Sequence, residues 1–193
     1  MEQQLNTVNS AVGICSQALI SLGANSINDF EENTDSARLC ANLYPSLRAE
    51  LLRFHPWLCC LKRARLAADI DKPAFGWQFS YTLPGDCLRV MGINDGRDLY
   101  TIESGKLLTD AGECRLKYVW LNDNEATWSA QLVKVMVITM KAALAYPITK
   151  DLAARNAFEQ ERMLALKFAK TVDGMEIPPQ EFSADLLIEA RYS

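Results

Sequence analysis

Residues 75–83 read FGWQFSYTL, and this stretch decides the fold class. Its large apolar side chains occupy every second position from Phe75 to Leu83, with small or polar residues between them. A period of two is typical of a β-strand that buries one face and leaves the other in water. We therefore predict a strand here, with its aromatic side chains in the core.

Further short strands follow on the C-terminal side. Ser104-Gly105 stands between two alternating runs and predicts a two-residue hairpin loop. Pro84-Gly85-Asp86 and Asn94-Asp95-Gly96 predict turns. We expect strands at 75–83, 88–93, 99–103, 106–109 and 115–121. Strands this close together in sequence predict an antiparallel β-meander with at least one edge to protect.

On the N-terminal side the apolar spacing changes to three and four residues, which predicts helices. The first helix is expected over 8–22, with Gly23 as its left-handed C-cap residue. A second begins among the N-cap candidates of 33–36, and Pro45 is expected to kink it or divide it in two. Residues 57–66 are predicted to continue as a shorter helix or turn.

Helical spacing returns after the strands. We predict one helix from Glu125 to Tyr146, with Pro147 as its stop, and another over 151–172. The chain then continues through Ile177-Pro178-Pro179, which cannot extend a helix.

These elements predict an α+β protein: a helical bundle of N- and C-terminal helices with a central inserted antiparallel β-meander. Residues 1–72 and 122–176 form one α-helical domain in this prediction, and 73–121 form the β insertion. Residues 177–193 form a C-terminal arm.

Composition limits the function. The 193-residue chain is 49% hydrophobic and 23% charged, an ordinary globular balance, and its net charge of −4 offers no overall cationic field for DNA. Its six cysteines form no CxxC pair, so we expect no metal and no cofactor. The start of the chain lacks the positive region of a signal peptide, which predicts reduced cysteines in a protein made in a cytoplasm. The apolar run 132–148 contains two lysines and is expected to be a buried helix, not a membrane span.

Catalytic candidates are few. A serine or cysteine triad needs a histidine, and His55 is the one histidine of the chain, at a helix end where a capping role is expected. Five carboxylates could form a glycosidase pair, although loop carboxylates usually cap helices and turns; they are Glu31, Glu32, Asp35, Glu103 and Asp110. We therefore predict no catalytic, cofactor-binding or metal-binding residue.

Two further features are candidate sites. Pro56-Trp57 stands between the helices and the sheet, so we expect a structural junction with Trp57 buried between the two layers. Lys62, Arg63 and Arg65 form the one local positive cluster, a candidate contact for DNA or an acidic partner. The simpler interpretation, a solvated helix face, is favoured.

Several motifs in a fixed order resemble one family. They are TDSA (34–37), LYPSLR (43–48), LLRFHPW (51–57), KRARLA (62–67) and FGWQFSYTLPGDCLRV (75–90). Their order and spacing resemble the tail tubular protein A, or head-to-tail adaptor, family of T7-like short-tailed bacteriophages. The resemblance covers residues 5–172.

The resemblance implies a structural virion protein and not an enzyme. It implies a ring of about twelve copies between the portal protein and the tail nozzle protein, around a channel through which DNA passes in transit. Tail fibres are a candidate further partner whose attachment is left open, no membrane is involved, and the protein is expected in the virion tail after synthesis in the bacterial host cytoplasm. Two alternatives stay open: a tail-associated carbohydrate hydrolase with a carboxylate pair, and a monomeric nucleic-acid-binding adaptor.

The arm leads to a prediction. Its apolar and basic residues are expected to contact the portal or a neighbouring subunit; they are Phe182, Leu186, Leu187, Arg191 and Tyr192. Deletion of 177–193 should leave the melting temperature of the isolated subunit nearly unchanged and abolish attachment to the portal or ring, as measured by co-sedimentation. A truncated subunit that unfolds, or that still assembles, would show that the arm is packing and not a connector.

Overall fold

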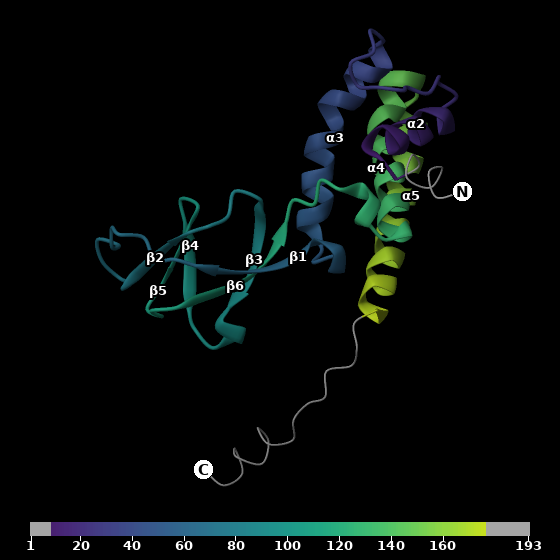
Figure 1. Ribbon diagram of the computed structural model, residues 1–193. Helices are drawn as coiled ribbons and strands as arrows, with labels where there is room; N and C mark the ends of the chain where they lie inside the picture. The colour runs from purple at the N-terminus through teal and green to yellow at the C-terminus, as the bar shows by residue number, and fades with distance from the viewer. Residues whose placement is uncertain (1–8, 177–193) are drawn as a thin grey trace.

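The computed structural model describes residues 9–176, and these residues adopt an α+β fold. Four helices lie together on one side of the molecule, and six strands in two small antiparallel sheets lie on the other (Figure 1). The predicted C-terminal arm, 177–193, lies outside the described residues, as do the five contact residues assigned to it.

The two N-terminal helices begin at side-chain caps. Helix α2 (Ala11–Ser21) starts where Ser10 Oγ accepts the Gly13 amide at 3.0 Å, and Gly23 follows its end with φ of 77°, as predicted. Helix α3 (Asp35–Phe54) starts where Thr34 Oγ1 accepts the Ala37 amide at 3.2 Å. α3 is one helix through Pro45 and is not divided in two.

The first of the two C-terminal helices begins and ends later than predicted. Residues Glu125–Thr127 form a short 3-10 turn, η3, and α4 (Ala130–Thr149) begins after Ser129. Pro147 does not stop α4: the helix continues to Thr149, where Thr149 Oγ1 donates to the Ala145 carbonyl and the Lys150 amide donates to the Tyr146 carbonyl. The helix ends at Lys150, whose φ is 59°. Helix α5 spans Leu152–Met175.

Helix α4 is the centre of the helical part. It contacts α2, α3 and α5, and it buries Leu132, Met136, Met140 and Leu144 completely. Within residues 9–176 it is the one helix that is long and apolar enough to cross a membrane, and more than half of it is buried inside the protein. We therefore assign α4 as the core helix against which the other three pack.

The strands form two sheets and not a meander. One sheet has the order β1-β6-β3 and the other β2-β5-β4, and all pairs are antiparallel. Their bounds are β1 Leu61–Leu66, β2 Phe79–Thr82, β3 Cys87–Ile93, β4 Tyr100–Glu103, β5 Lys106–Thr109 and β6 Cys114–Trp120. The meander prediction was wrong because β1 and β6, far apart in sequence, pair with each other.

The prediction for 57–66 was also wrong. Only Leu58–Cys60 form a 3-10 turn, η1, and the β part begins with β1 inside the segment predicted as helical. Strand β2 is shorter than expected, and Phe75 is exposed and not in the core. The hairpin at Ser104-Gly105 is confirmed: both residues have positive φ, 49° and 76°, as a two-residue turn between β4 and β5 requires.

Each part has its own apolar core. One core gathers the four helices with Trp57, Cys60 and Val119, and the other lies between the two sheets around Tyr81, Leu107 and Leu116. Trp120 packs against both cores. The chain therefore crosses between the parts at two places that lie next to each other, before β1 and after β6.

Asp69 ties the second sheet together. Its carboxylate accepts hydrogen bonds from Ser80 Oγ (2.8 Å) and Thr82 Oγ1 (2.9 Å) on β2, and from Lys106 Nζ (2.9 Å) on β5. The Lys106 ammonium and the two hydroxyl groups hold the pKa of Asp69 at about 2, below the usual value of 3.8.

This environment predicts a titration. Because the pKa of Asp69 is depressed in the folded state, its stabilising effect is complete above about pH 4 and is lost as the pH falls toward 2. We expect the Asp69 carboxyl to titrate by NMR with a midpoint near 2, and Lys106→Met to move the midpoint upward. A midpoint of Asp69 that does not move in Lys106→Met would contradict this account.

Candidate functional site

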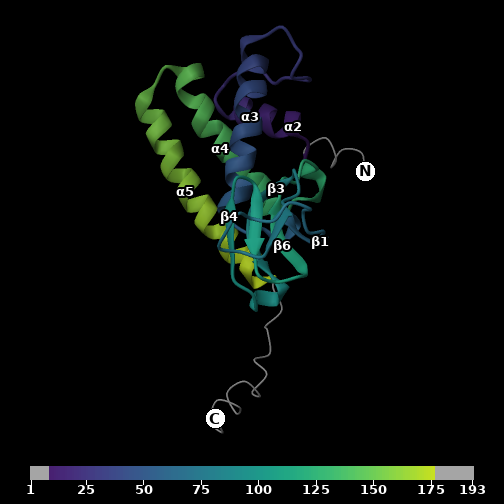
Figure 2. The ribbon, with the colours of Figure 1, turned by 90° about the vertical axis from the view of Figure 1, so that its left-hand side faces the viewer.

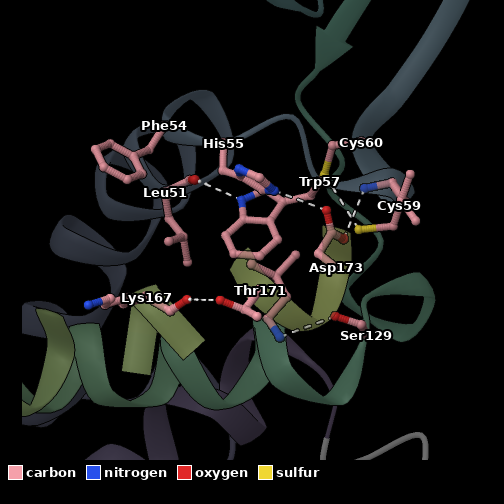
Figure 3. Close-up of polar contacts among 12 residues, drawn as sticks. Leu51, Phe54, His55, Trp57, Cys59, Cys60, Ser129, Lys167, Thr171 and Asp173 are labelled. Atoms are coloured by element: carbon pink, nitrogen blue, oxygen red, sulfur yellow. Dashed lines mark hydrogen bonds and ion pairs between the residues drawn. The ribbon is translucent and has the colours of Figure 1, made fainter. Parts of the chain in front are cut away.

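The predicted junction at Pro56-Trp57 lies where α3 meets the first crossing to the β part. Trp57 is completely buried, and its Nε1 donates to the Leu51 carbonyl at 3.0 Å (Figure 3). Its ring meets the His55 ring edge-on, with 4.6 Å between the centroids. Burial of Trp57 is confirmed; the indole closes the end of the core that the helices share with Val119 of β6.

The end of α5 fastens the same turn. Asp173 is buried, accepts the Leu58 amide at Oδ1 (3.2 Å), and lies 3.0 Å from His55 Nε2 through Oδ2 (Figure 3). His55 with Asp173 resembles two members of a catalytic triad, but within residues 9–176 no thiol hydrogen-bonds to His55. The pair therefore supports a structural role, the capping role expected for His55.

Asn122 fastens the second crossing to the first. It is buried, and its Nδ2 donates to the Cys59 carbonyl and to Thr127 Oγ1, both at 2.9 Å. One amide therefore joins η1 to η3, the two segments that connect the helical part with the sheets. Neither Asn122 nor Asp173 carries a sequence signal, because both act through contacts with residues distant in the chain.

A second buried carboxylate lies deeper in the helical part. Glu125 Oε1 accepts from Tyr44 Oη at 2.9 Å and from Arg48 Nη1 at 3.0 Å. Burial, together with the Glu125 charge, raises the pKa of the Tyr44 phenol. The ion pair and the phenol hydrogen bond hold α3 against η3, and Arg48 Nε is left as a buried donor without a partner among the described residues.

The cysteines show no metal site. All six thiols are free, and within residues 9–176 no group of three cysteine, histidine or acidic side chains gathers around a common point. Cys59 and Cys60 are adjacent in η1, with their sulfur atoms 3.7 Å apart (Figure 3). Their hydrogen bond lowers the pKa of Cys59, and with burial it raises the pKa of Cys60.

The structure separates the predicted basic cluster into two faces of β1. Because side chains alternate along a strand, Lys62 points one way and Arg63 and Arg65 the other. Lys62 Nζ binds Asp86 Oδ2 at 2.8 Å and lies 3.4 Å from the centre of the Trp120 ring. Lys62 is therefore held by Asp86 and Trp120 on the face of the sheet opposite Arg63 and Arg65.

Asp86 is the acidic partner of Lys62 on this face of the sheet. Partial burial raises the pKa of Asp86, but hydrogen bonds from Lys62 and from Tyr118 Oη (3.2 Å) outweigh that effect and leave the pKa below its usual value. Burial and the Asp86 charge raise the pKa of Tyr118 to about 12. The cluster is satisfied internally, as a structural ion pair should be.

The outer face of the same sheet is strongly basic. Arg63 and Arg65 on β1 are exposed there beside Arg115 and Lys117 on β6, and the four side chains line a hollow of about 630 Å³. We call these four residues the basic face. The sequence predicted Arg63 and Arg65 as candidate contacts but not Arg115 and Lys117. The alternation of these two residues in the predicted strand 115–121 was the signal that could have identified them.

The register of the sheet sets like charges opposite each other. Arg63 pairs with Lys117 and Arg65 with Arg115. Arg115 is partly neutralised, because Asp95 and Glu113 each lie 3.6 Å from its guanidinium. Within residues 9–176 the other three cations form no ion pair. Like charges directly opposite each other destabilise a sheet, so folding does not account for the basic face.

The five predicted carboxylates are not brought together. Glu31, Glu32 and Asp35 lie in and after the loop between α2 and α3, where Asp35 pairs with Arg38 and Glu32 accepts the Asn28 amide. The other two belong to the sheets: Glu103 ends β4, and Asp110 accepts the Gln78 amide at 3.0 Å. Glu103 does line a hollow of about 400 Å³ with Asp71, but two lysines line it as well.

Compared with models of known protein families and with curated protein sequences, the chain matches none of them.

Trp57 gives a stability prediction. Replacing this fully buried side chain with Ala removes a large apolar volume and the hydrogen bond to Leu51, so Trp57→Ala should lower the free energy of unfolding by about 3–5 kcal/mol. Trp57→Phe, which keeps most of the ring volume, should lose less. Urea denaturation followed by circular dichroism measures both; a Trp57→Ala protein that unfolds with the parent's midpoint would refute the structural junction.

Lys117 gives a prediction of the opposite sign. Lys117→Glu replaces a repulsion opposite Arg63 by an attraction, so it should stabilise the protein by about 0.2–1 kcal/mol and raise its melting temperature. Lys134→Glu, the same charge change on the exposed side of α4, should not. Differential scanning calorimetry at low salt compares the two, and a drop in melting temperature for Lys117→Glu would mean that the repulsion is absent.

Proposed function

We propose that this protein is a structural subunit that forms a ring between the portal protein and the tail nozzle protein of a short-tailed phage, and that DNA leaves the capsid through its channel. The motif order of residues 34–90 supports this proposal, and so does the arrangement of four helices with inserted sheets. In this proposal the protein is a virion tail component and not an enzyme.

The observation that carries the proposal is the outer face of α5. This long helix lies at the outside of the helical part, alongside α4 (Figure 2). Its inward side buries Leu166 and Ala169, yet Leu164 is 71% exposed and Phe168, one turn later, is 60% exposed. Met163 and Met175 extend the exposed apolar area. We call these four residues the α5 apolar face.

Exposed apolar side chains that adjoin on one helix indicate a protein interface. A ring of identical subunits needs two different faces that are complementary, because each contact is head to tail. The β part exposes further large apolar side chains, Phe75, Leu99 and Ile102, and this part lies on the opposite side of α3 from α5 (Figure 1). Exposed apolar side chains on both parts of the molecule support side-by-side association in a closed ring.

The hydrolase alternative receives less support. Its discriminating feature is a pair of carboxylates about 5–9.5 Å apart in a cleft, and the five predicted residues divide between the α2–α3 region and the sheets. Two of those near α3 are used locally: Glu32 accepts the Asn28 amide, and Asp35 pairs with Arg38. We therefore retain the structural role as the proposed function.

The α5 apolar face provides the test. The double variant Leu164→Glu/Phe168→Glu should abolish ring formation and portal binding, since charged side chains would be buried at each subunit contact. Its melting temperature should stay near the parent's, because both side chains already face water. The control Asn25→Glu/Ser26→Glu adds the same two negative charges at exposed positions in the loop between α2 and α3, away from α5. Analytical ultracentrifugation of each protein, with and without portal, reads the result.

Assembly of the double variant at the parent's stoichiometry would overturn the assigned contact. A parent protein that stays monomeric with and without portal would overturn the ring itself.

A further inference from the structure

The basic face is an unexplained cost to folding. Two pairs of like charges lie directly opposite each other on β1 and β6, and three of the four cations have no acidic partner among the described residues. The chain as a whole is acidic, with a net charge of −4. A concentration of positive charge on one sheet face therefore points to an anionic ligand.

The chemistry of the face fits phosphate. Three of its four cations are arginines, whose planar guanidinium groups bind phosphate oxygens through two parallel hydrogen bonds. Neighbouring cations on one strand are about 6.6–6.8 Å apart, and the two strands are about 4.8 Å apart. The face therefore presents a grid of charge that several phosphates of one polymer can contact together.

The face lacks what an acidic protein partner would need. The centre of a protein interface is poor in charge and carries aromatic or apolar anchors. Among the described residues, four cations line the hollow with a single carboxylate, Asp95, which lies against Arg115, and Met91 is its one large exposed apolar side chain. It also has no aromatic residue on which a base could stack. Both facts favour a nucleic-acid backbone, bound without regard to sequence, over a folded protein.

We propose that the basic face, Arg63, Arg65, Arg115 and Lys117, binds the phosphodiester backbone of duplex DNA. This goes beyond the proposed function, since a ring could let DNA pass without touching it. With three or four phosphate contacts the binding is weak and dominated by counterion release, which lets DNA slide along the surface. A few cations in an acidic chain therefore guide the polymer without holding it.

Fluorescence anisotropy of a labelled 20-base-pair duplex with the full-length protein tests this. Three or four contacts predict that log Kd rises with log salt with a slope of about 3, a loss of affinity of about 40- to 150-fold between 50 and 200 mM NaCl. Arg65→Glu and Lys117→Glu should each weaken binding at 50 mM by tenfold or more and reduce the slope by about 1. Lys134→Glu and Lys167→Glu, which change the net charge equally on α4 and α5, should bind like the parent.

Lys117→Glu separates binding from folding, because the same change is expected to stabilise the sheet. A variant that melts higher and binds DNA less cannot have lost affinity by unfolding. If Arg65→Glu lowers the melting temperature, Arg65→Gln, which removes the charge and keeps a long polar side chain, replaces it.

Three results would overturn the proposal. The first is that the parent protein does not bind the duplex at 50 mM NaCl. The second is that the variants of the basic face and the helix controls lose equal affinity for the duplex. The third is that poly-glutamate displaces the duplex at equal charge concentration. The last would assign the face to an acidic polypeptide. The ring proposal is tested independently of DNA binding, because the Arg65→Glu and Lys117→Glu proteins should assemble like the parent whatever their affinity for DNA.

Discussion

The arrangement of the helical part and the β part depends on the hydrogen bonds of the buried Asp173 carboxylate. The last turns of α5 bring it to the first crossing, where it accepts the Leu58 amide and lies against His55. Without it, a backbone amide would be left unpaired at the edge of the apolar core, which costs about 1–3 kcal/mol. The end of the last described helix therefore fixes the direction in which the chain leaves α3.

The two crossings are joined by the β1–β6 pairing, which reaches Leu61 and Val119, and beyond it by side-chain hydrogen bonds. Asn122 joins η1 to η3, and two arginines join α3 to β3: Arg53 donates to the Leu88 carbonyl, and Arg89 Nη1 lies 3.5 Å from the Phe54 carbonyl. Such bonds are directional, so they set an angle that apolar packing alone leaves free. The sheets consequently present their basic face at a defined orientation to the helices.

Local patterns predicted much of the fold. The α+β class, the ends of α2, the start of α3, the β4–β5 hairpin and the burial of Trp57 all follow from spacing, caps and turn residues. The errors came from pairing between distant segments. KRAR was interpreted as a helix face, but residues 62–65 form a strand because they pair with β6, which lies about fifty residues further along the chain.

The candidate site shows the same limit. Arg63 and Arg65 were singled out from the sequence, whereas Arg115 and Lys117 were not, because only the register of β1 against β6 places the four together. Lys62 was assigned to the same cluster, and alternation along β1 removes it to the opposite face. A charge cluster in a sequence thus identifies a surface only when the period of its secondary structure is known.

The position of α4 in the chain has a consequence for how the protein is made. The helices α2 and α3 leave the ribosome before α4, the central helix that covers most of their apolar faces. Closure of the junction waits longer still, because His55 and Asp173 are 118 residues apart in sequence. Contacts this distant make folding slow and leave apolar surface open during synthesis. The two helices therefore keep apolar surface open to solvent until α4 and the end of α5 have been synthesised.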